Sequence, residues 1–346
     1  MRYTFSVGSY LGIPVRVHFT FPLILLIFGG EAWARGGVLD GVRSVGLILA
    51  VFVCVVLHEF GHSIQVRRYG IRVRDIILLP IGGMARAERI PEKPWQEIVV
   101  AISGPAVNFV LAGLFFGIMW LRGDAVFDTE GFLANMLFIN IVLGVFNLVP
   151  AFPMDGGRIL RALLALRFPY LKATRQAKAV GQIIALAFVV IGFLNSAFLM
   201  LPVIAVFIFF GAMSEEQMIK VRVCLEDKIA GDLVDGEQRL FSLADPIESV
   251  VSGARSGTLA VPVSDPERTV TGAVTITDAT AAVRDGRGDD PVSSIVRFDF
   301  PVFRADTPAV QTYYFLKSEK KRYAGVMSEG VYLGLAHFDS FLDESR

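Results

Sequence analysis

Three side chains within five residues could bind and use a metal ion. Residues 58–62 read HEFGH, so His58 and His62 lie four positions apart and Glu59 follows the first histidine. Residues four apart share one face of an α-helix, so both imidazoles can bind one zinc ion while Glu59 reaches a water molecule on it. So short a pattern also arises by chance, and the alternative is two polar residues near a helix end.

The sequence around this motif favours the metal. The stretch from Val45 to Tyr69 is otherwise largely apolar. Burying imidazoles and a carboxylate in such a segment is costly unless something pairs with them, and ionisable residues inside a membrane usually mark a function. Cys54 lies four residues before His58 and could be a further ligand, but a buried thiol is more often a small hydrophobic residue.

The composition is that of a membrane protein. The chain has 346 residues, of which 53% are hydrophobic and 19% are charged. Long apolar runs end near residue 214 and a more polar, strand-like pattern follows, so we predict two domains, 1–215 and 216–346. A net charge of zero argues against nucleic acid as a partner. Two cysteines, Cys54 and Cys224, give no disulfide framework, which fits a reducing cytosolic face.

Six apolar segments predict six transmembrane helices, with approximate bounds 12–30, 42–67, 95–121, 131–149, 178–194 and 197–213. The first resembles a secretory signal because Ala32-Trp33-Ala34 looks like a cleavage site, but we expect a retained helix. His18, near its start, is expected to be an interfacial or packing histidine. In the third segment, Ser103-Gly104-Pro105 and Asn108 predict a bend or break.

Residues 71–90, between the second and third segments, predict a β-hairpin or short sheet. They alternate apolar and polar side chains and are interrupted at Pro80 and at Gly82-Gly83.

The basic residues predict the orientation in the membrane. The two strongly basic connections follow the second and fourth segments, and we expect them in the cytosol. Six spans then place both termini in the cytosol. The basic residues are Arg67, Arg68, Arg72, Arg74, Arg86, Arg89 and Lys93 in one connection and Arg158, Arg161, Arg167, Lys172, Arg175 and Lys178 in the other.

A third metal ligand is expected from the end of the fourth segment. The second and fourth segments run in the same direction, so His58, His62 and Asp155 can meet at one depth. A catalytic zinc usually has three protein ligands and one open position. Asp155 follows an apolar span and precedes two glycines. The alternative is an aspartate that caps the helix starting near Gly156.

Together, HEFGH, SGPAVN (103–108) and FNLVPAFPMDGGRIL (146–160) resemble the site-2 protease family of intramembrane zinc metalloproteases, over about residues 10–215. The resemblance implies one zinc ion per chain, held by His58, His62 and Asp155, with Glu59 as general base. It also implies that Asn108 and Asn147 lie near the substrate backbone or oxyanion. The alternative is that these amides tie a broken helix together.

The resemblance further implies that residues 71–90 form a membrane-embedded sheet. A transmembrane substrate must unwind before its amides can be reached, and an exposed strand edge can take up the unwound segment. We expect that edge around Ile77 to Met84.

The C-terminal part is predicted to be a cytosolic α/β module. Residues 259–282 predict strand, turn, strand and helix, and Gly272, Thr275 and Asp278 resemble the G-x-x-T-x-x-D element of CBS repeats. The resemblance implies a CBS pair that binds ATP or AMP, with Thr275 and Asp278 on ribose or phosphate. The second copy, 301–342, has strands around 323–327 and 331–336 but carries His337 and Asp339 at altered spacing. The alternative is a packing and dimerisation module without a ligand.

The sequence thus predicts a zinc-dependent intramembrane endopeptidase with six transmembrane helices, a small membrane-associated sheet and a CBS-like regulatory domain. Its expected partners are a single-span membrane protein as substrate and a second copy bound through the CBS-like module. The alternatives are a CBS-regulated transporter or channel, which would show repeated broken helices in two halves, and a silent homologue that binds membrane proteins without cutting them.

Overall fold

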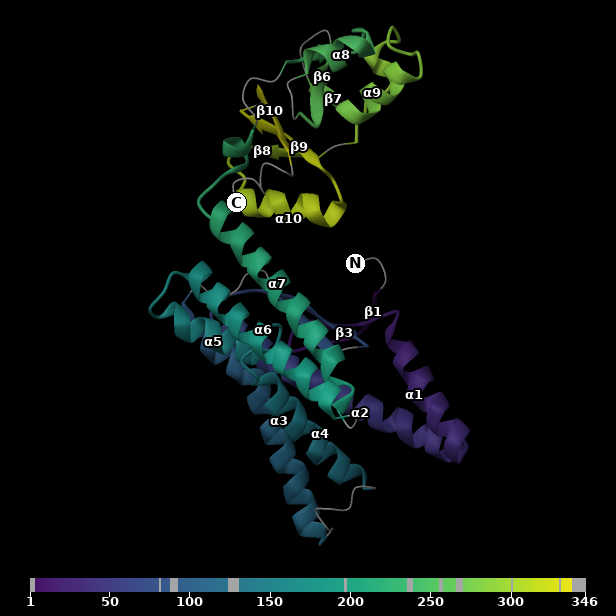
Figure 1. The fold of residues 1–346 in the computed structure, drawn as a ribbon, viewed down its shortest axis with the longest axis vertical. Coiled ribbons are helices and arrows are strands. Elements are labelled where there is room, and N and C mark those ends of the chain that lie inside the picture. The colour runs from purple at the N-terminus through teal and green to yellow at the C-terminus, as the bar shows by residue number, and fades with distance from the viewer. Residues whose placement is uncertain are drawn as a thin grey trace. The chain divides into compact units, whose positions relative to one another are not determined.

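The computed structural model describes residues 4–80, 82–87, 93–123, 131–195, 198–234, 239–254, 258–265, 270–299, 301–329 and 331–337. The chain divides into two compact units, Met1–Glu216 and Gln217–Arg346 (Figure 1).

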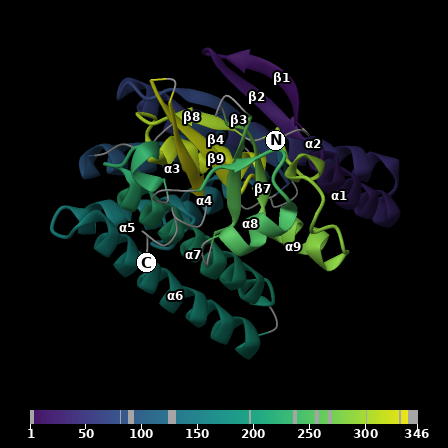
Figure 2. The same ribbon diagram turned by 90° about the horizontal axis from the view of Figure 1, so that it is seen from above.

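A four-stranded sheet begins the first unit. Its order is β1 (Thr4–Tyr10), β2 (Ile13–His18), β3 (Val73–Leu79) and β4 (Gly82–Ala87). The pairs β1–β2 and β3–β4 are antiparallel, while β2 and β3 are parallel. Figure 2 shows β1 and β2 side by side. The hairpin predicted within 71–90 is confirmed for the described residues; residues 81 and 88–90 lie outside them.

One sequence prediction about this region is wrong and another is only partly right. A first helix over 12–30 does not form, because Ile13, Val15 and Val17 alternate with more polar residues and add β2 to the sheet beside β3. The helix α1 starts only at Phe21 and ends at Gly36. The expected edge also shifts, because β3 is paired on both sides, so only the part of 77–84 that belongs to β4 lies on the edge.

Six further helices follow: α2 (Val38–Arg68), α3 (Pro94–Arg122), α4 (Phe132–Asn147), α5 (Asp155–Ala165), α6 (Tyr170–Leu194) and α7 (Leu201–Leu225). Of the described helices, α2, α3, α6 and α7 are long and apolar enough to cross a membrane, and α4 is a shorter apolar helix. At about 1.5 Å per residue, the 16 residues of α1 or α4 rise about 24 Å, less than the roughly 30 Å hydrocarbon core. The six-span count stays a prediction.

The third helix is continuous. Pro105 and Asn108 lie inside α3, which is helical from Pro94 to Arg122, so of the bend or break expected at residues 103–108, the break does not occur. The predicted bounds of the last two spans also differ, since α6 begins earlier, at Tyr170, and α7 continues to Leu225.

Helices α2 and α3 are in close backbone contact at Gly61. A Cβ atom added at Gly61 of α2 would lie 2.6 Å from the carbonyl oxygen of Ser103 on α3. Glycine at this position therefore brings the two backbones together. On another face of α2, Phe60 and Val66 pack with Ile13 and Ile76 of the sheet, so this apolar cluster fixes the sheet against the helix.

A buried arginine joins three helices of the first unit. Arg161 of α5 is fully buried, and its guanidinium donates to Glu97 of α3 and, at 2.8 Å, to Glu215 of α7. The hydroxyl of Tyr170 donates to the other oxygen of Glu97 at 2.9 Å. Because every charge has a partner, this network can stay buried while it holds α5 in place.

The second unit contains two three-stranded sheets. The first has β5 (Phe241–Ser242), β6 (Ala260–Ser264) and β7 (Val270–Thr275), with helices α8 (Ile247–Gly253) and α9 (Ile276–Arg284). The second has β8 (Val302–Arg304), β9 (Tyr323–Ser328) and β10 (Val331–His337), with α10 (Ala309–Glu319). Short 3-10 helices cover Ala230–Leu233 and Val292–Ser294. The predicted strand and helix order is confirmed.

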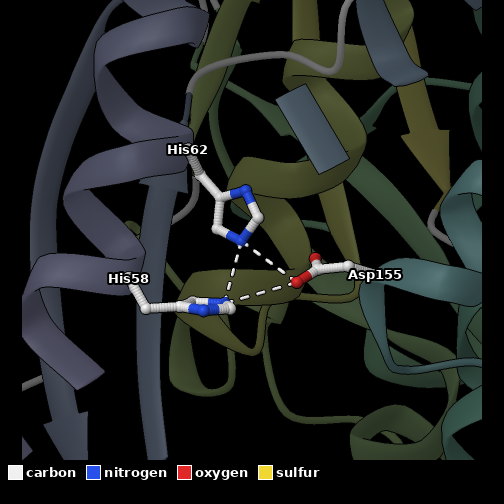
Figure 3. Close-up of side chains that lie close together, drawn as sticks. All are labelled: His58, His62 and Asp155. Atoms are coloured by element: carbon white, nitrogen blue, oxygen red, sulfur yellow. Dashed lines mark hydrogen bonds and ion pairs between the residues drawn. The ribbon is translucent and has the colours of Figure 1, made fainter. Parts of the chain in front are cut away.

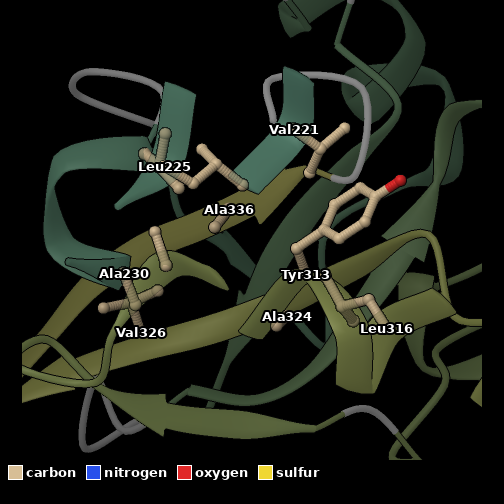
Figure 4. Packing of buried hydrophobic residues seen from close by; sticks show 10 residues of the cluster. Val221, Leu225, Ala230, Tyr313, Leu316, Ala324, Val326 and Ala336 are labelled. Atoms are coloured by element: carbon tan, nitrogen blue, oxygen red, sulfur yellow. The ribbon is translucent and has the colours of Figure 1, made fainter. Parts of the chain in front are cut away.

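The core of the second sheet also takes in the end of α7. Leu225 and Val221 pack with Tyr313 and Leu316 of α10 and with Val326 of β9 (Figure 4). This part of α7 therefore belongs to the hydrophobic core of the second unit.

Replacing Arg161 should destabilise the first unit. In Arg161→Leu, the carboxylates of Glu97 and Glu215 lose their shared partner while buried, so we expect the free energy of unfolding to fall by about 3–5 kcal/mol. Arg175→Leu is the control, because Arg175 is 55% exposed and pairs with Glu216 at the surface. We expect less than about 1 kcal/mol there. Thermal unfolding in detergent measures both, and equal shifts would contradict this prediction.

Candidate metal centre

Three ligand atoms converge where α2 meets the start of α5. The Nε2 atoms of His58 and His62 lie 3.1 Å apart, and Oδ2 of Asp155 lies 3.3 Å from the first and 3.2 Å from the second. Figure 3 shows both imidazoles projecting from one helix toward the carboxylate. Among the described residues, a search for clusters of histidine, cysteine and acidic side chains close enough to share a metal ion finds these three residues.

The outer nitrogen of each imidazole is held by α3. His62 Nδ1 lies 2.7 Å from the carbonyl oxygen of Val100, which can only accept, so His62 carries its proton on Nδ1. His58 Nδ1 lies 2.5 Å from Oδ1 of Asn108, which also accepts. In the neutral form of each ring, Nε2 is then unprotonated, and both Nε2 atoms face the site.

This arrangement fits zinc. Two imidazole lone pairs and one carboxylate oxygen repel each other at these distances unless a metal ion or a proton lies between them. Tetrahedral zinc with ligand bonds of about 2.0–2.1 Å requires ligand atoms about 3.3 Å apart, close to the 3.1–3.3 Å observed. The carboxylate and both imidazoles are the ligand types that zinc accepts, and three protein ligands leave one position open for chemistry.

Asp155 is placed by the backbone around it and is not a helix cap. It is the first residue of α5, the cap position is Met154, and no side chain caps this helix. The capping alternative is therefore wrong. A Cβ atom at Gly156 would lie 2.3 Å from the carbonyl oxygens of Leu148 and Val149. Without side chains there, the backbone folds back tightly and turns Asp155 toward α2.

Gly104 keeps the metal position open. A Cβ atom at this residue of α3 would lie 2.2 Å from Nε2 of His62 and 2.7 Å from Nε2 of His58. The sequence singled out Gly104 only as a helix breaker. Its role in leaving space for a metal could be found only once α3 was placed against α2.

Glu59 contacts the edge strand of the sheet. The backbone N–H of Ala85 in β4 donates to Oε2 of Glu59 at 3.0 Å. A Cβ atom at Gly83, also in β4, would lie 2.7 Å from Cγ of Glu59. The carboxylate that would act as a base is thus held directly beside an unpaired strand edge.

The two predicted asparagines lie in different environments. Asn108 is fully buried and bonded to His58, so it holds a candidate metal ligand and does not tie a broken helix together. Asn147 is partly buried and donates to the carbonyl oxygen of Leu143 in its own helix. The structure gives no contact between Asn147 and the three ligand residues.

Two other residues raised by the sequence are not ligands in this arrangement. His18 ends β2, and its Nδ1 lies 2.7 Å from the hydroxyl of Thr20. Cys54 is buried and free, and its sulfur lies 3.4 Å from the amide nitrogen of Asn140.

A second candidate site lies in the Gln217–Arg346 unit. A cavity of about 330 Å³ is lined by one carboxylate, four basic side chains and several other residues. Burial raises the pKa of the Tyr323 hydroxyl in its wall. The lining residues are Leu259, Thr275, Thr277, Arg297, Asp299, Lys320, Lys321, Arg322 and Tyr323.

Of the two residues predicted to hold a nucleotide, one lines this cavity. Thr275 lines the cavity, and its hydroxyl also caps α9 by accepting a hydrogen bond from the backbone N–H of Asp278. The Asp278 carboxylate pairs with Arg297 at 2.8 Å and is not part of the lining. In the second copy, His337 is buried at the end of β10, and Asp339 lies outside the described residues.

Comparison with known proteins identifies the family. The profile of peptidase family M50 matches residues 46–129 and 123–192. A zinc metalloprotease of Methanocaldococcus jannaschii is 36% identical over 238 residues, which are 68% of this chain and 67% of that protein. The chain belongs to peptidase family M50. This is the family of the site-2 proteases, and with four helices able to cross a membrane, this M50 member is a multi-pass membrane protein.

Two solved structures are also similar to this M50 peptidase. The site-2 protease from Methanocaldococcus jannaschii has a TM-score of 0.47 at 36% identity, covering 62% of this chain and 95% of that one. The CBS domain of a bacterial CNNM/CorC family Mg²⁺ transporter, in complex with ATP, has a TM-score of 0.33 at 20% identity. It covers 38% of this chain and 96% of that one.

A methyl group at residue 104 should prevent zinc binding. In Gly104→Ala, the new carbon would lie against both Nε2 atoms, so we expect zinc affinity to fall at least about 100-fold, since two ligands must move. Gly113→Ala is the control, because it lies in the same helix with no atom within 4 Å of an added Cβ. Chelator competition on the purified proteins measures both affinities. Tight binding by Gly104→Ala would show that the metal lies elsewhere.

Proposed function

We propose that this M50 peptidase is a zinc-dependent endopeptidase that hydrolyses peptide bonds within or next to transmembrane segments. The observation that carries the proposal is the convergence of His58, His62 and Asp155 in a chain with long apolar helices. A single-span membrane protein is the substrate we propose.

The ligand residues and the base have separate roles in this reaction. His58 Nε2, His62 Nε2 and Asp155 Oδ2 would hold the zinc ion, which when bound lowers the pKa of a water molecule and polarises an amide carbonyl. Glu59 follows His58 on the same helix and is not one of the three ligands. Its carboxylate accepts the proton from the attacking water and passes it to the leaving nitrogen.

The edge strand β4 would present the substrate to this base. A helical substrate hides its amides in its own hydrogen bonds, so the segment to be cut must be extended. An extended segment can pair with an exposed strand, and β4 has β3 on one side only. The contact between Ala85 and Glu59 means that a peptide added there lies next to the base.

We also propose that the cavity of the second unit binds ATP or AMP and so regulates the enzyme. Four basic side chains and one carboxylate line it, an excess of positive charge that suits phosphate groups. Thr275, predicted from the CBS-like element, lies in the same wall. Pairing of two copies through this unit stays a prediction, as does the cytosolic location of both termini, which rests on the distribution of basic residues.

Replacing the base should separate catalysis from metal binding. In Glu59→Gln, the carboxamide cannot take up a proton, so we expect cleavage to fall by at least about 100-fold, the lower range for a general base. Zinc content should stay at one ion per chain, because Glu59 is not among the three ligands. Mass spectrometry of membrane fractions would identify single-span proteins that accumulate intact in the variant.

Two outcomes of this comparison would contradict the proposal. Cleavage that survives Glu59→Gln would mean that another group is the base. The wild type could also contain one zinc ion per chain and yet leave the same membrane proteins intact as the variant does. That result would favour the silent homologue, which binds membrane proteins without cutting them. A transporter would instead move a solute in vesicles and keep that activity in Glu59→Gln.

Removing one cation from the cavity should weaken nucleotide binding. Arg297 lines the cavity, so we expect Arg297→Gln to bind ATP at least about 10-fold less tightly, a typical cost for a charged contact. Arg304→Gln is the control, because Arg304 also pairs with an aspartate, Asp306, but does not line the cavity. Equilibrium dialysis of the full chain with labelled ATP and AMP measures binding. Absence of binding by the wild type would support the ligand-free packing module.

A further inference from the structure

Asn140 is a fully buried polar residue in the middle of α4, and the proposed mechanism does not use it. An amide in such a position is costly unless its donors and acceptor are all paired. Asn140 meets this requirement through contacts with three residues from three helices.

The contacts of Asn140 determine how its amide group is turned. Its nitrogen donates to the carbonyl oxygen of Met136 at 2.9 Å and lies 3.4 Å from the sulfur of Cys54. A backbone carbonyl can only accept, so the NH₂ end of Asn140 must face Met136. Its oxygen must then face Asn108.

The orientation of Asn140 in turn determines that of Asn108. The Asn140 oxygen accepts from the amide nitrogen of Asn108 at 3.0 Å, which leaves the Asn108 oxygen pointing at His58. That oxygen can only accept, so His58 must carry its proton on Nδ1. The lone pair on Nε2 is then available for a metal ion.

We infer that Asn140 is a positioning residue for the metal ligand His58 and acts through Asn108. This inference rests on the proposed zinc site and deepens it. Without Asn140, the Asn108 amide can turn over and present its NH₂ group to His58. The imidazole proton then moves to Nε2, where it competes with zinc.

Zinc affinity of the purified full chain tests this inference. We expect Asn140→Leu to bind zinc about 10- to 100-fold less tightly, the usual effect of losing a group that orients a metal-binding histidine. Asn135→Leu is the matched control. It makes the same substitution in the same helix, and its amide likewise donates to the carbonyl four residues earlier, Gly131, whereas the described side-chain hydrogen bonds of Asn108 go to His58 and Asn140. This control should bind zinc as the wild type does.

A change at residue 108 separates positioning from packing. In Asn108→Asp, both side-chain oxygens accept hydrogen bonds. Rotation of the carboxylate therefore always presents an acceptor to Nδ1 of His58. In that background we expect Asn140→Leu to change the zinc dissociation constant by less than about twofold, because the two sites are coupled through one hydrogen-bond chain. If the double variant loses affinity as strongly as Asn140→Leu does alone, Asn140 acts only by packing and the inference is overturned.

Two further variants cover the remaining outcomes. Asn140→Ser shortens the side chain without adding apolar bulk. It replaces Asn140→Leu in the test if the leucine variant does not fold, and we expect the same loss of zinc affinity. His58→Ala tests the site itself. If His58→Ala binds zinc as tightly as the wild type, the proposed zinc site is wrong. If His58→Ala loses zinc but the Asn140 variants match Asn135→Leu, only the inference about Asn140 is wrong.

Discussion

The close approach of α2 and α3 is the constraint on which the metal centre depends. Gly61 lets the two backbones meet, and Gly104 leaves space in front of the imidazoles. At this spacing α3 supplies no metal ligand, yet it accepts a hydrogen bond from each histidine, through Val100 and Asn108. A wider gap would lose both bonds, and the lone pairs of the histidines would no longer be directed to one point. The carboxylate from α5 completes the candidate site that this pair of helices forms.

The elements that carry the chemistry could be predicted from the sequence because their patterns are local. The helix around HEFGH, the hairpin in 71–90 and the order of β6, β7 and α9 follow from the period of their apolar residues. The segment 12–30 was misread because the alternation in β2 covers only six residues and runs into the apolar residues of α1. What decides that segment is its pairing with β3, which is distant in the sequence and leaves no local signal.

The finer structure of the site could not be predicted, because it depends on buried groups from several helices. Asn108 was expected near the substrate, and only its packing against α2 shows that its oxygen faces His58. Asn140 offered a single signal, a polar residue in an apolar helix, which does not say what it bonds to. The network around Arg161 likewise joins residues from three helices, although the sequence placed Arg161 only among the basic residues of a cytosolic connection.

The hydrogen bond from Ala85 to Glu59 has a further consequence for the order of events in the site. One backbone N–H can serve either the carboxylate of Glu59 or the carbonyl oxygen of an arriving peptide, and full bonds to both at once exceed its capacity. A strand that pairs with β4 at Ala85 therefore takes this donor away from Glu59. The hydrogen bond to Glu59 must therefore break before a peptide can pair fully with β4 at Ala85.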